Sequence, residues 1–246
     1  MGADVVGIEV TGSVGLIEIR RPHRRNAVDA ATAELLVEAV GRLDADPGVT
    51  AIVLCGQGGD LSSGADMDEP LPDPASVEWR RTPHARLLRA VRTSALPVVA
   101  SVEGWVLGLG AGLVGASTYA VAGDSARFGF PEARFGFFPM GAVPNVIRRV
   151  RPDVVLRWAL TGRHLDAAEA AAHALVTDVV PAGEALRFAR DLAAELGSAP
   201  RHVVTAGMEW LRRWAGHAVG PLDDWAEARV SFARPPAPSA PPEPPG

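Results

Sequence analysis

The stretch that decides the fold is LPVVASVEGWVLGLGAG, residues 96–112. Its first seven residues, 96–102, are mostly apolar and end two residues before Gly104, a pattern typical of a short buried strand. The glycine-rich residues that follow lead into residues 113–120, which we expect to be helical. A glycine-rich turn between a strand and a helix leaves backbone N–H groups unpaired, and the helix dipole adds positive charge there. This junction is therefore a candidate site for a negatively charged oxygen.

The chain before this stretch alternates strands with helices. Residues 5–10 and 14–20 alternate apolar and polar positions about a tight turn, which predicts a hairpin. Asp29 is a candidate N-cap for a helix whose apolar residues, from Leu35 to Leu43, share one face. We expect the remaining elements to be a strand at 50–54, a loop at 56–68 and a helix at 77–92. The repetition of strand and helix predicts an α/β fold.

The chain after residue 124 has a mostly helical pattern. The helices are expected at residues 143–149, 154–161, 167–174, 184–196, 202–214 and 222–232, with a strand at 176–180. Residues 235–246 are rich in proline and are expected to form a flexible tail. The predicted organisation is a core at residues 1–195, a helical region at 196–234 and the tail at 235–246.

The composition removes several classes of protein. The chain has 246 residues, of which 48% are hydrophobic and 22% charged, as in a folded globular protein. Its net charge of -5 offers no general positive field for nucleic acid. All 24 basic residues are arginine, which excludes Schiff-base and P-loop lysine chemistry. Cys55 is the single cysteine, and the pattern contains no secretory signal and no membrane span, so we expect a cytoplasmic protein without disulfide bonds.

Two further segments carry candidate chemistry. The loop at residues 61–67 follows an apolar strand, and its small residues let a ligand approach the backbone N–H groups. The second segment, FGFPEARFGFFP at residues 128–139, places Glu132 among phenylalanines. Burial there raises the pKa of a carboxyl group toward neutral values, which suits a catalytic base. The alternative is an ordinary ion pair between Glu132 and Arg127 or Arg134.

Together these segments resemble the crotonase, or enoyl-CoA hydratase/isomerase, superfamily. The resemblance is carried by residues 52–66, by residues 96–110 and by the Pro-Glu motif at 128–132, in the order that the family has them. Residues 21–27, RPHRRNA, are similar to the first substrate loop of the family, and residues 160–176 are similar to a later signature. The resemblance covers residues 5–215 and implies a crotonase-like spiral of strand-strand-helix (ββα) turns with a helical C-terminal region.

The resemblance also implies a substrate, an assembly and roles for matched residues. The substrate is an acyl-CoA thioester, no cofactor is needed beyond the coenzyme A of the substrate, and the assembly is a homotrimer or hexamer. The backbone N–H groups of Ala65 and Leu109 form the oxyanion hole, and Glu132 is the catalytic carboxylate. The residues expected to border the substrate are Arg25, Ala27, Ser63, Gly64, Asp66, Met67 and Gly112.

One departure from the family pattern favours a particular reaction. Hydratases of this family carry a second glutamate where this chain has Gly112. One carboxylate alone orients and protonates an added water poorly, whereas it can remove a proton from C2 of a 3-enoyl thioester and return it at C4. We therefore predict an enoyl-CoA isomerase of fatty acid metabolism. Hydration, decarboxylation, carbon–carbon bond formation and hydrolysis, on a CoA-bound or carrier-protein-bound substrate, stay open because they use the same oxyanion hole.

Two alternatives lie outside enolate chemistry. The first is a non-catalytic scaffold with the crotonase fold, which the loss of one glutamate allows. The second is a nicotinamide dehydrogenase, because residues 110–115 fit the pattern G-x-G-x-x-G.

Three aromatic residues, Trp79, Phe137 and Phe138, could line an acyl pocket. The six histidines lack the spacing of metal ligands, and the acidic residues at 66–69 are expected to form a solvated rim rather than a cation site.

Overall fold

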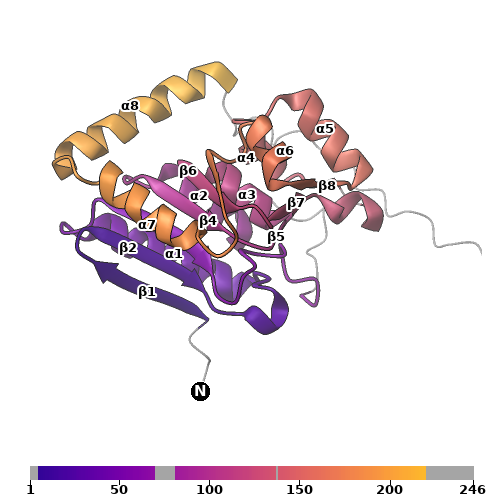
Figure 1. Cartoon of the computed structure of the whole chain (residues 1–246), viewed down its shortest axis with the longest axis horizontal. Helices are drawn as coiled ribbons and strands as arrows, with labels where there is room; N and C mark the ends of the chain where they lie inside the picture. The colour runs from indigo at the N-terminus through magenta and orange to yellow at the C-terminus, as the bar shows by residue number, and fades with distance from the viewer. Residues whose placement is uncertain (1–4, 70–80, 137, 220–246) are drawn as a thin grey trace, which may run out of the picture.

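The computed structural model describes residues 5–69, 81–136 and 138–219. The strands within these ranges are β1 (Val6–Thr11), β2 (Val14–Ile19), β3 (Ala51–Gly56), β4 (Val98–Val102), β5 (Trp105–Leu107), β6 (Tyr119–Gly123), β7 (Arg127–Gly129), β8 (His164–Asp166) and β9 (Asp178–Val180). The helices are α1 (Ala30–Ala45), α2 (Pro83–Thr93), α3 (Leu109–Ala116), α4 (Val143–Val146), α5 (Pro152–Thr161), α6 (Ala167–Ala172), α7 (Ala185–Leu196) and α8 (Arg201–Val219). Two short 3-10 helices are η1 (Pro22–Arg24) and η3 (Pro131–Phe135). This order confirms the predicted α/β class (Figure 1).

Within the described ranges, six strands form the main sheet in the spatial order β1-β2-β3-β4-β6-β9. β1 and β2 form the predicted antiparallel hairpin, and every later pair is parallel. Parallel neighbours need a crossover, which α1 supplies between β2 and β3 and α2 supplies between β3 and β4. The carboxyl ends of parallel strands meet at one edge of a sheet, so the segments after β3 and β4 leave the sheet side by side.

The two faces of the main sheet are covered by different helices. In β3, Ala51, Val53 and Cys55 pack toward α7, whereas Ile52 and Leu54 belong to the core under α1 and α2. This alternation follows from the two-residue period of a strand. All five side chains are at most 4% exposed. The continuous apolar run at residues 51–55 is therefore a central strand buried on both faces.

Local signals placed some helix ends correctly and others wrongly. Asp29 is the N-cap of α1, as predicted, and its carboxylate accepts a hydrogen bond from the Thr32 N–H at 2.7 Å. Leu35, expected on the buried face of that helix, is 42% exposed. The helix predicted at 77–92 begins at Pro83, because Thr82 caps it and a proline is well placed in the first helical turn.

A second, smaller sheet was not predicted. β7 is its central strand, with β5 parallel on one side and β8 antiparallel on the other. Each strand has three residues, which is too short for an alternating pattern to be told from a loop. Its inner face is formed by Val106, Phe128 and Leu165, all nearly inaccessible to solvent. This sheet lies beside α4, α5 and α6 in Figure 1 and leads β5 directly into α3.

The helix predicted at residues 113–120 is wrong in its bounds. The observed helix α3 spans Leu109–Ala116, and residues 119–120 begin strand β6. Glycine lowers helix propensity, so residues 108–112 resemble a loop when only the sequence is considered. Packing explains the glycines, since a Cβ at Gly110 would collide with the carbonyl oxygen of Ser62 and one at Gly115 with the backbone of Asn145. Close approach of α3 to its neighbours outweighs its weak propensity.

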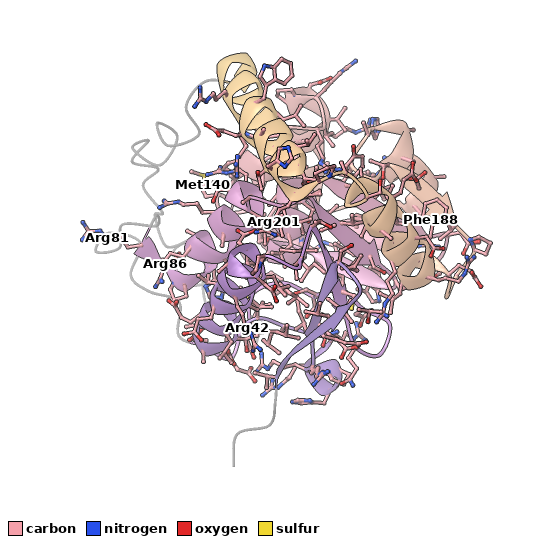
Figure 2. The ribbon with its side chains drawn as sticks, turned by 90° about the vertical axis from the view of Figure 1, so that its left-hand side faces the viewer. Arg42, Arg81, Arg86, Met140, Phe188 and Arg201 are labelled. Carbon is pink, nitrogen blue, oxygen red and sulfur yellow. The ribbon has the colours of Figure 1, made fainter. Side chains whose placement is uncertain are left out.

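Helix α8 crosses the top of the molecule in Figure 1 and is attached by arginines. Arg201, labelled in Figure 2, lies at the start of α8. It donates to the carbonyl oxygens of Asp44 and Val49. Arg212 donates to the carbonyl oxygen of Ser94 at 2.7 Å. Asp44 lies in the last turn of α1 and Ser94 is the C-cap of α2, so cations meet the negative ends of two helices.

The sequence predicts a core that ends at residue 195 and a tail that begins at residue 235. The limit at residue 195 falls in the last turn of α7, just before α8. The tail at residues 235–246 and the helix expected at 222–232 lie outside the described residues, as do Trp79 and Phe137. Phe138 is half-buried and packs against the main core. Of the helices in the described ranges, none has both the length and the apolar character that crossing a bilayer requires.

Candidate functional site

The loop after β3 is held by backbone hydrogen bonds along both of its edges. On one edge, the Val28 N–H donates to the Gly64 carbonyl at 2.9 Å and the Asp66 N–H donates to the Val28 carbonyl at 3.0 Å. On the other edge, the Leu107 N–H of β5 donates to the Ser62 carbonyl at 3.0 Å. The loop therefore runs as an extended segment between residue 28 and β5.

The Ala65 N–H is directed away from Val28. The Gly64 carbonyl and the Ala65 N–H belong to one peptide group, and in a trans peptide these two bonds point in opposite directions. Because the Gly64 carbonyl accepts from Val28, the Ala65 N–H faces the opposite edge, where β5 leads into α3. Within the described ranges, this N–H donates to no protein acceptor. It is a donor that can bind a ligand oxygen.

The second candidate donor is the Leu109 N–H at the start of α3. Gly108 is the N-cap, with φ 50° and ψ -112°, a conformation that glycine adopts far more easily than other residues. Leu109 is the first helical residue, so no carbonyl inside the helix can accept from it, and no other acceptor in the described part of the chain does. A Cβ at Gly64 would lie 3.7 Å from the Leu109 nitrogen. The fold thus brings the predicted donors, Ala65 and Leu109, to one place at a positive helix end.

Glu132 lies against the backbone just before the Leu109 donor. It stands in the first turn of η3, directly after Pro131. A Cβ at Gly108 would collide with Oε1 of Glu132, so a glycine is needed for this approach. Oε2 is buried, and no group in the described residues forms a hydrogen bond with it. Burial raises the pKa of this carboxyl group from 4.5 to about 7.

The alternative role for Glu132, an ordinary ion pair, is excluded by the positions of the two neighbouring arginines. Arg127 donates to the carbonyl oxygens of residues 124–126, and Arg134 donates to the carbonyl of Gly162 at 2.9 Å. Among the described residues, no charged group contributes to the pKa shift of Glu132, whose largest cause is desolvation. A buried carboxyl without a cation is suited to taking up and releasing a proton near neutral pH.

Gly112 faces space that its neighbours already fill. A Cβ at this position would lie 3.0 Å from the Cα of Ala142 and 3.1 Å from Cδ2 of Leu88. Both distances are shorter than ordinary van der Waals contact between carbon atoms. The position where the resemblance expects a second glutamate therefore holds no carboxylate, and a side chain there would require these neighbours to shift.

The other predicted substrate residues lie along the loop after β3 and beside it. The Arg25 side chain is exposed, and its backbone carbonyl accepts from the Ser63 N–H at 2.9 Å. Ala27 is buried two residues later, and Met67 is 60% exposed. An exposed guanidinium beside a ligand loop can meet phosphate groups. Arg25, Ala27 and Ser63 thus form one continuous border of the loop.

The Asp66 carboxylate does not face solvent as predicted. It is buried, and its Oδ2 lies 2.9 Å from Nη2 of Arg21. Asp68 pairs with Arg24, and Glu69 accepts a hydrogen bond from the first residue of α1 at 3.0 Å. The solvated acidic rim is therefore wrong for Asp66, because a buried arginine draws its side chain inward. Its backbone, and not its carboxylate, is left to border a substrate.

Three residues that support the site were not singled out from the sequence. The Asn26 side chain is fully buried and donates to the carbonyls of Gln57 at 2.9 Å and Asp60 at 2.6 Å. It also accepts from the Arg21 N–H at 2.9 Å. Asp60 accepts from the Trp105 N–H at 2.7 Å. These bonds join the first loop, the loop after β3 and strand β5. The sequence signals them only through an asparagine that directly follows two arginines.

The dehydrogenase alternative fails on the placement of its glycines. A dinucleotide fingerprint needs its first glycine in the turn before the helix, but residues 110–115 lie inside α3. Glu132, the only acidic residue at a suitable distance, lies in η3 and not at the end of a strand. In the described part of the chain, no three His, Cys, Asp or Glu side chains gather in a way that could hold a metal ion.

Comparisons with known proteins identify the family and the fold. Residues 9–219 match the family model described as Enoyl-CoA hydratase/isomerase. The chain is 32% identical to enoyl-CoA hydratase EchA19 of Mycobacterium tuberculosis over 192 residues, which are 76% of this chain and 72% of the relative. An enoyl-CoA hydratase/isomerase structure from Marinobacter aquaeolei matches with a TM-score of 0.77 at 30% identity, over 92% of this chain and 89% of that one. An enoyl-CoA hydratase structure from Mycobacterium avium matches with a TM-score of 0.79 at 26% identity, over 93% and 96%.

Proposed function

Because the chain belongs to the enoyl-CoA hydratase/isomerase family, with the crotonase fold, we propose that it moves the double bond of a 3-enoyl-CoA into conjugation with the thioester. The observation that carries this proposal is a buried carboxylate that pairs with no cation among the described residues, beside two backbone donors that no described acceptor uses. Glu132 supplies the carboxylate, and Ala65 and Leu109 supply the donors.

The first step is removal of a proton from C2 by the Glu132 carboxylate. The electron pair of the C2–H bond moves into the thioester, which places negative charge on the carbonyl oxygen. The N–H groups of Ala65 and Leu109 donate to this oxygen and stabilise the dienolate. Removing one such donor typically costs about 2.7 to 4 kcal/mol of transition-state stabilisation.

The second step returns the same proton to C4. The carbonyl is restored as the C1–C2 electrons form the C2–C3 double bond, the C3–C4 double bond breaks as its electrons bond the proton at C4, and the Glu132 O–H bond breaks to regenerate the carboxylate. The carboxyl pKa of about 7 suits both steps, because the group is readily ionised and readily protonated near neutral pH. The reaction needs no cofactor, and the coenzyme A is part of the substrate.

A second candidate, hydration of a 2-enoyl-CoA, is favoured by the names of the relatives, which include enoyl-CoA hydratases. The packing at Gly112 argues against it. Gly112 supplies no second carboxylate to orient a water, and Ala142 and Leu88 crowd the place of a Cβ at this position. If Glu132 is the one acid–base group, isomerisation is the simpler reaction, because it needs one proton carrier and no oriented water.

Binding of the coenzyme A portion is assigned to the border of the loop. Arg25 is placed to meet phosphate groups, and Ala27, Ser63 and Met67 lie along the same segment. The backbone of Gly64 completes this border next to the donors. A homotrimer or hexamer in the cytoplasm is part of the same proposal, and sedimentation velocity measures the assembly.

The test is conversion of a 3-enoyl-CoA to its 2-enoyl isomer, followed by ultraviolet absorbance. The parent protein should be active, and Glu132→Gln should lose nearly all activity, whereas Glu195→Gln, an exposed carboxylate on α7, should keep it. Efficient hydration of crotonyl-CoA by the parent protein would refute the isomerase proposal and favour a hydratase.

A scaffold without catalysis gives a different result. Exchange of the C2 protons of a saturated acyl-CoA in deuterated water detects enolate formation without any complete reaction. An active oxyanion hole accelerates this exchange, and Glu132→Gln removes the acceleration. If the parent protein binds the acyl-CoA but does not accelerate the exchange of its C2 protons, the protein is a non-catalytic scaffold.

A further inference from the structure

Arg21 is a buried cation that holds three acceptors at once. Its guanidinium donates to the Ala27 carbonyl, and its Nη2 lies 2.9 Å from Oδ2 of Asp29 and 2.9 Å from Oδ2 of Asp66. Its side chain is 12% exposed, and that of Asp66 is 9% exposed. With its acceptors all inside the protein, this guanidinium is committed to the fold and not to a ligand.

The three acceptors lie on either side of the segment that carries the Ala65 donor. Asp66 directly follows Ala65. Ala27 directly precedes Val28, whose N–H and carbonyl form the two hydrogen bonds that hold residues 64 and 66. Asp29 follows Val28, and its other oxygen caps α1. Val28 and Ala65 are paired as an isolated β-bridge. The guanidinium of Arg21 therefore joins the residues on either side of Val28 to the residue that follows Ala65.

The direction of the Ala65 N–H depends on this bridge. The N–H shares a rigid peptide group with the Gly64 carbonyl, and that carbonyl is fixed by the Val28 N–H. If residue 66 moves relative to residue 28, the peptide group turns and the N–H leaves the direction of the Leu109 donor. Misplacement of a catalytic group by about 1 Å can lower a rate by about 100-fold.

We propose that Arg21 is a positioning residue of the oxyanion hole, which fixes the Ala65 N–H through Asp66 and Ala27. This inference rests on the proposed function of Ala65 as an oxyanion donor. The guanidinium of Arg21 is held by acceptors of the protein, so we assign it no contact with the substrate. A lysine at position 21 has a single charged nitrogen and lacks the planar fork that spans several acceptors, so it keeps the charge but not the geometry.

The test compares Arg21→Lys and Asp66→Asn with the parent protein and with Arg86→Lys. Arg86 is the matched control, because it lies on the outer side of α2 and forms an exposed ion pair with Glu34 at 2.7 Å (Figure 2). Infrared difference spectra of a bound acyl-CoA with a ¹³C-labelled thioester carbonyl report the hydrogen bonds on that oxygen directly. The isomerase assay gives kcat and KM for each variant, and circular dichroism shows that it is folded.

We expect the parent and Arg86→Lys to lower the carbonyl stretching frequency on binding. Arg21→Lys and Asp66→Asn should move it back toward the value of the free thioester and lower kcat by about 10-fold or more, with KM changed less than about threefold. Loss of kcat with an unchanged carbonyl frequency would overturn the positioning role, as would unchanged kcat in both folded variants. If the parent itself leaves the frequency unchanged, the oxyanion hole fails and the proposed function fails with it.

Discussion

Because its carboxyl group is buried, Glu132 is expected to lower the stability of the protein at alkaline pH. Burial raises its pKa from 4.5 to about 7, so unfolding between these pH values exposes the group and releases a proton. The free energy of unfolding then falls by about 1.4 kcal/mol for each pH unit. Over the span between the two pKa values the loss is about 2 to 3 kcal/mol, after allowance for the part of the residue that contacts solvent. Above pH 7 the loss is constant.

Glu132→Gln isolates this effect, because glutamine keeps the shape and cannot ionise. Urea unfolding of the parent and the variant at pH 5, 6, 7 and 8 measures the difference in stability. The variant should be only slightly more stable at pH 5 and about 2 to 3 kcal/mol more stable at pH 8. Glu195→Gln controls for the loss of one negative charge at an exposed position. A stabilisation of Glu132→Gln that is equal at pH 5 and pH 8 would refute the reasoning from burial.

Three further predictions concern the site. For isomerisation, kcat/KM should rise with pH to a plateau with a midpoint near 7, because only ionised Glu132 accepts the proton; a flat profile from about pH 5 to 9 contradicts this. Gly108→Ala should lower kcat by at least about tenfold in the same assay, since its Cβ collides with Oε1 of Glu132 and its φ is positive; a folded variant with full activity argues against that packing. Gly112→Glu should lower the free energy of unfolding by about 1 to 3 kcal/mol through contact with Ala142 and Leu88, and should not hydrate crotonyl-CoA; measurable hydration would show that a carboxylate fits there.

The parts of the fold that the sequence predicted are those set by neighbours along the chain. The hairpin of β1 and β2 follows from alternation about Gly12, whose φ of 58° suits a tight turn. The N-cap at Asp29 follows from a side chain that bonds three residues ahead. Such signals need no knowledge of distant segments, so they can be recognised directly.

The parts that the sequence did not predict depend on distant contacts. Helix α3 starts at Leu109 because its glycines pack against the loop after β3 and against α4. Helix propensity depends only on nearby residues, so it carries no information about these contacts. Likewise, the position of the Asp66 carboxylate is set by Arg21, which lies far from it along the chain. A loop rich in acidic residues predicts exposure unless its cation partner is known.

The candidate site was predictable to the extent that it lies on recognisable motifs. Ala65, Leu109 and Glu132 were selected by resemblance, and the fold brings all three together. The raised pKa of Glu132 was expected from the phenylalanines around it in the sequence. The contact of its carboxylate with Gly108 was not, because it depends on the parallel pairing of β5 with β7.

Helix α3 has consequences for how the protein loses activity when it is heated. All eight of its residues are buried, so the Leu109 donor begins one of the innermost helices of the described chain. Local fraying affects exposed ends first, whereas a buried helix opens only with the core around it. Thermal inactivation should therefore coincide with global unfolding, and the remaining isomerase activity at each temperature should equal the fraction of molecules that are still folded.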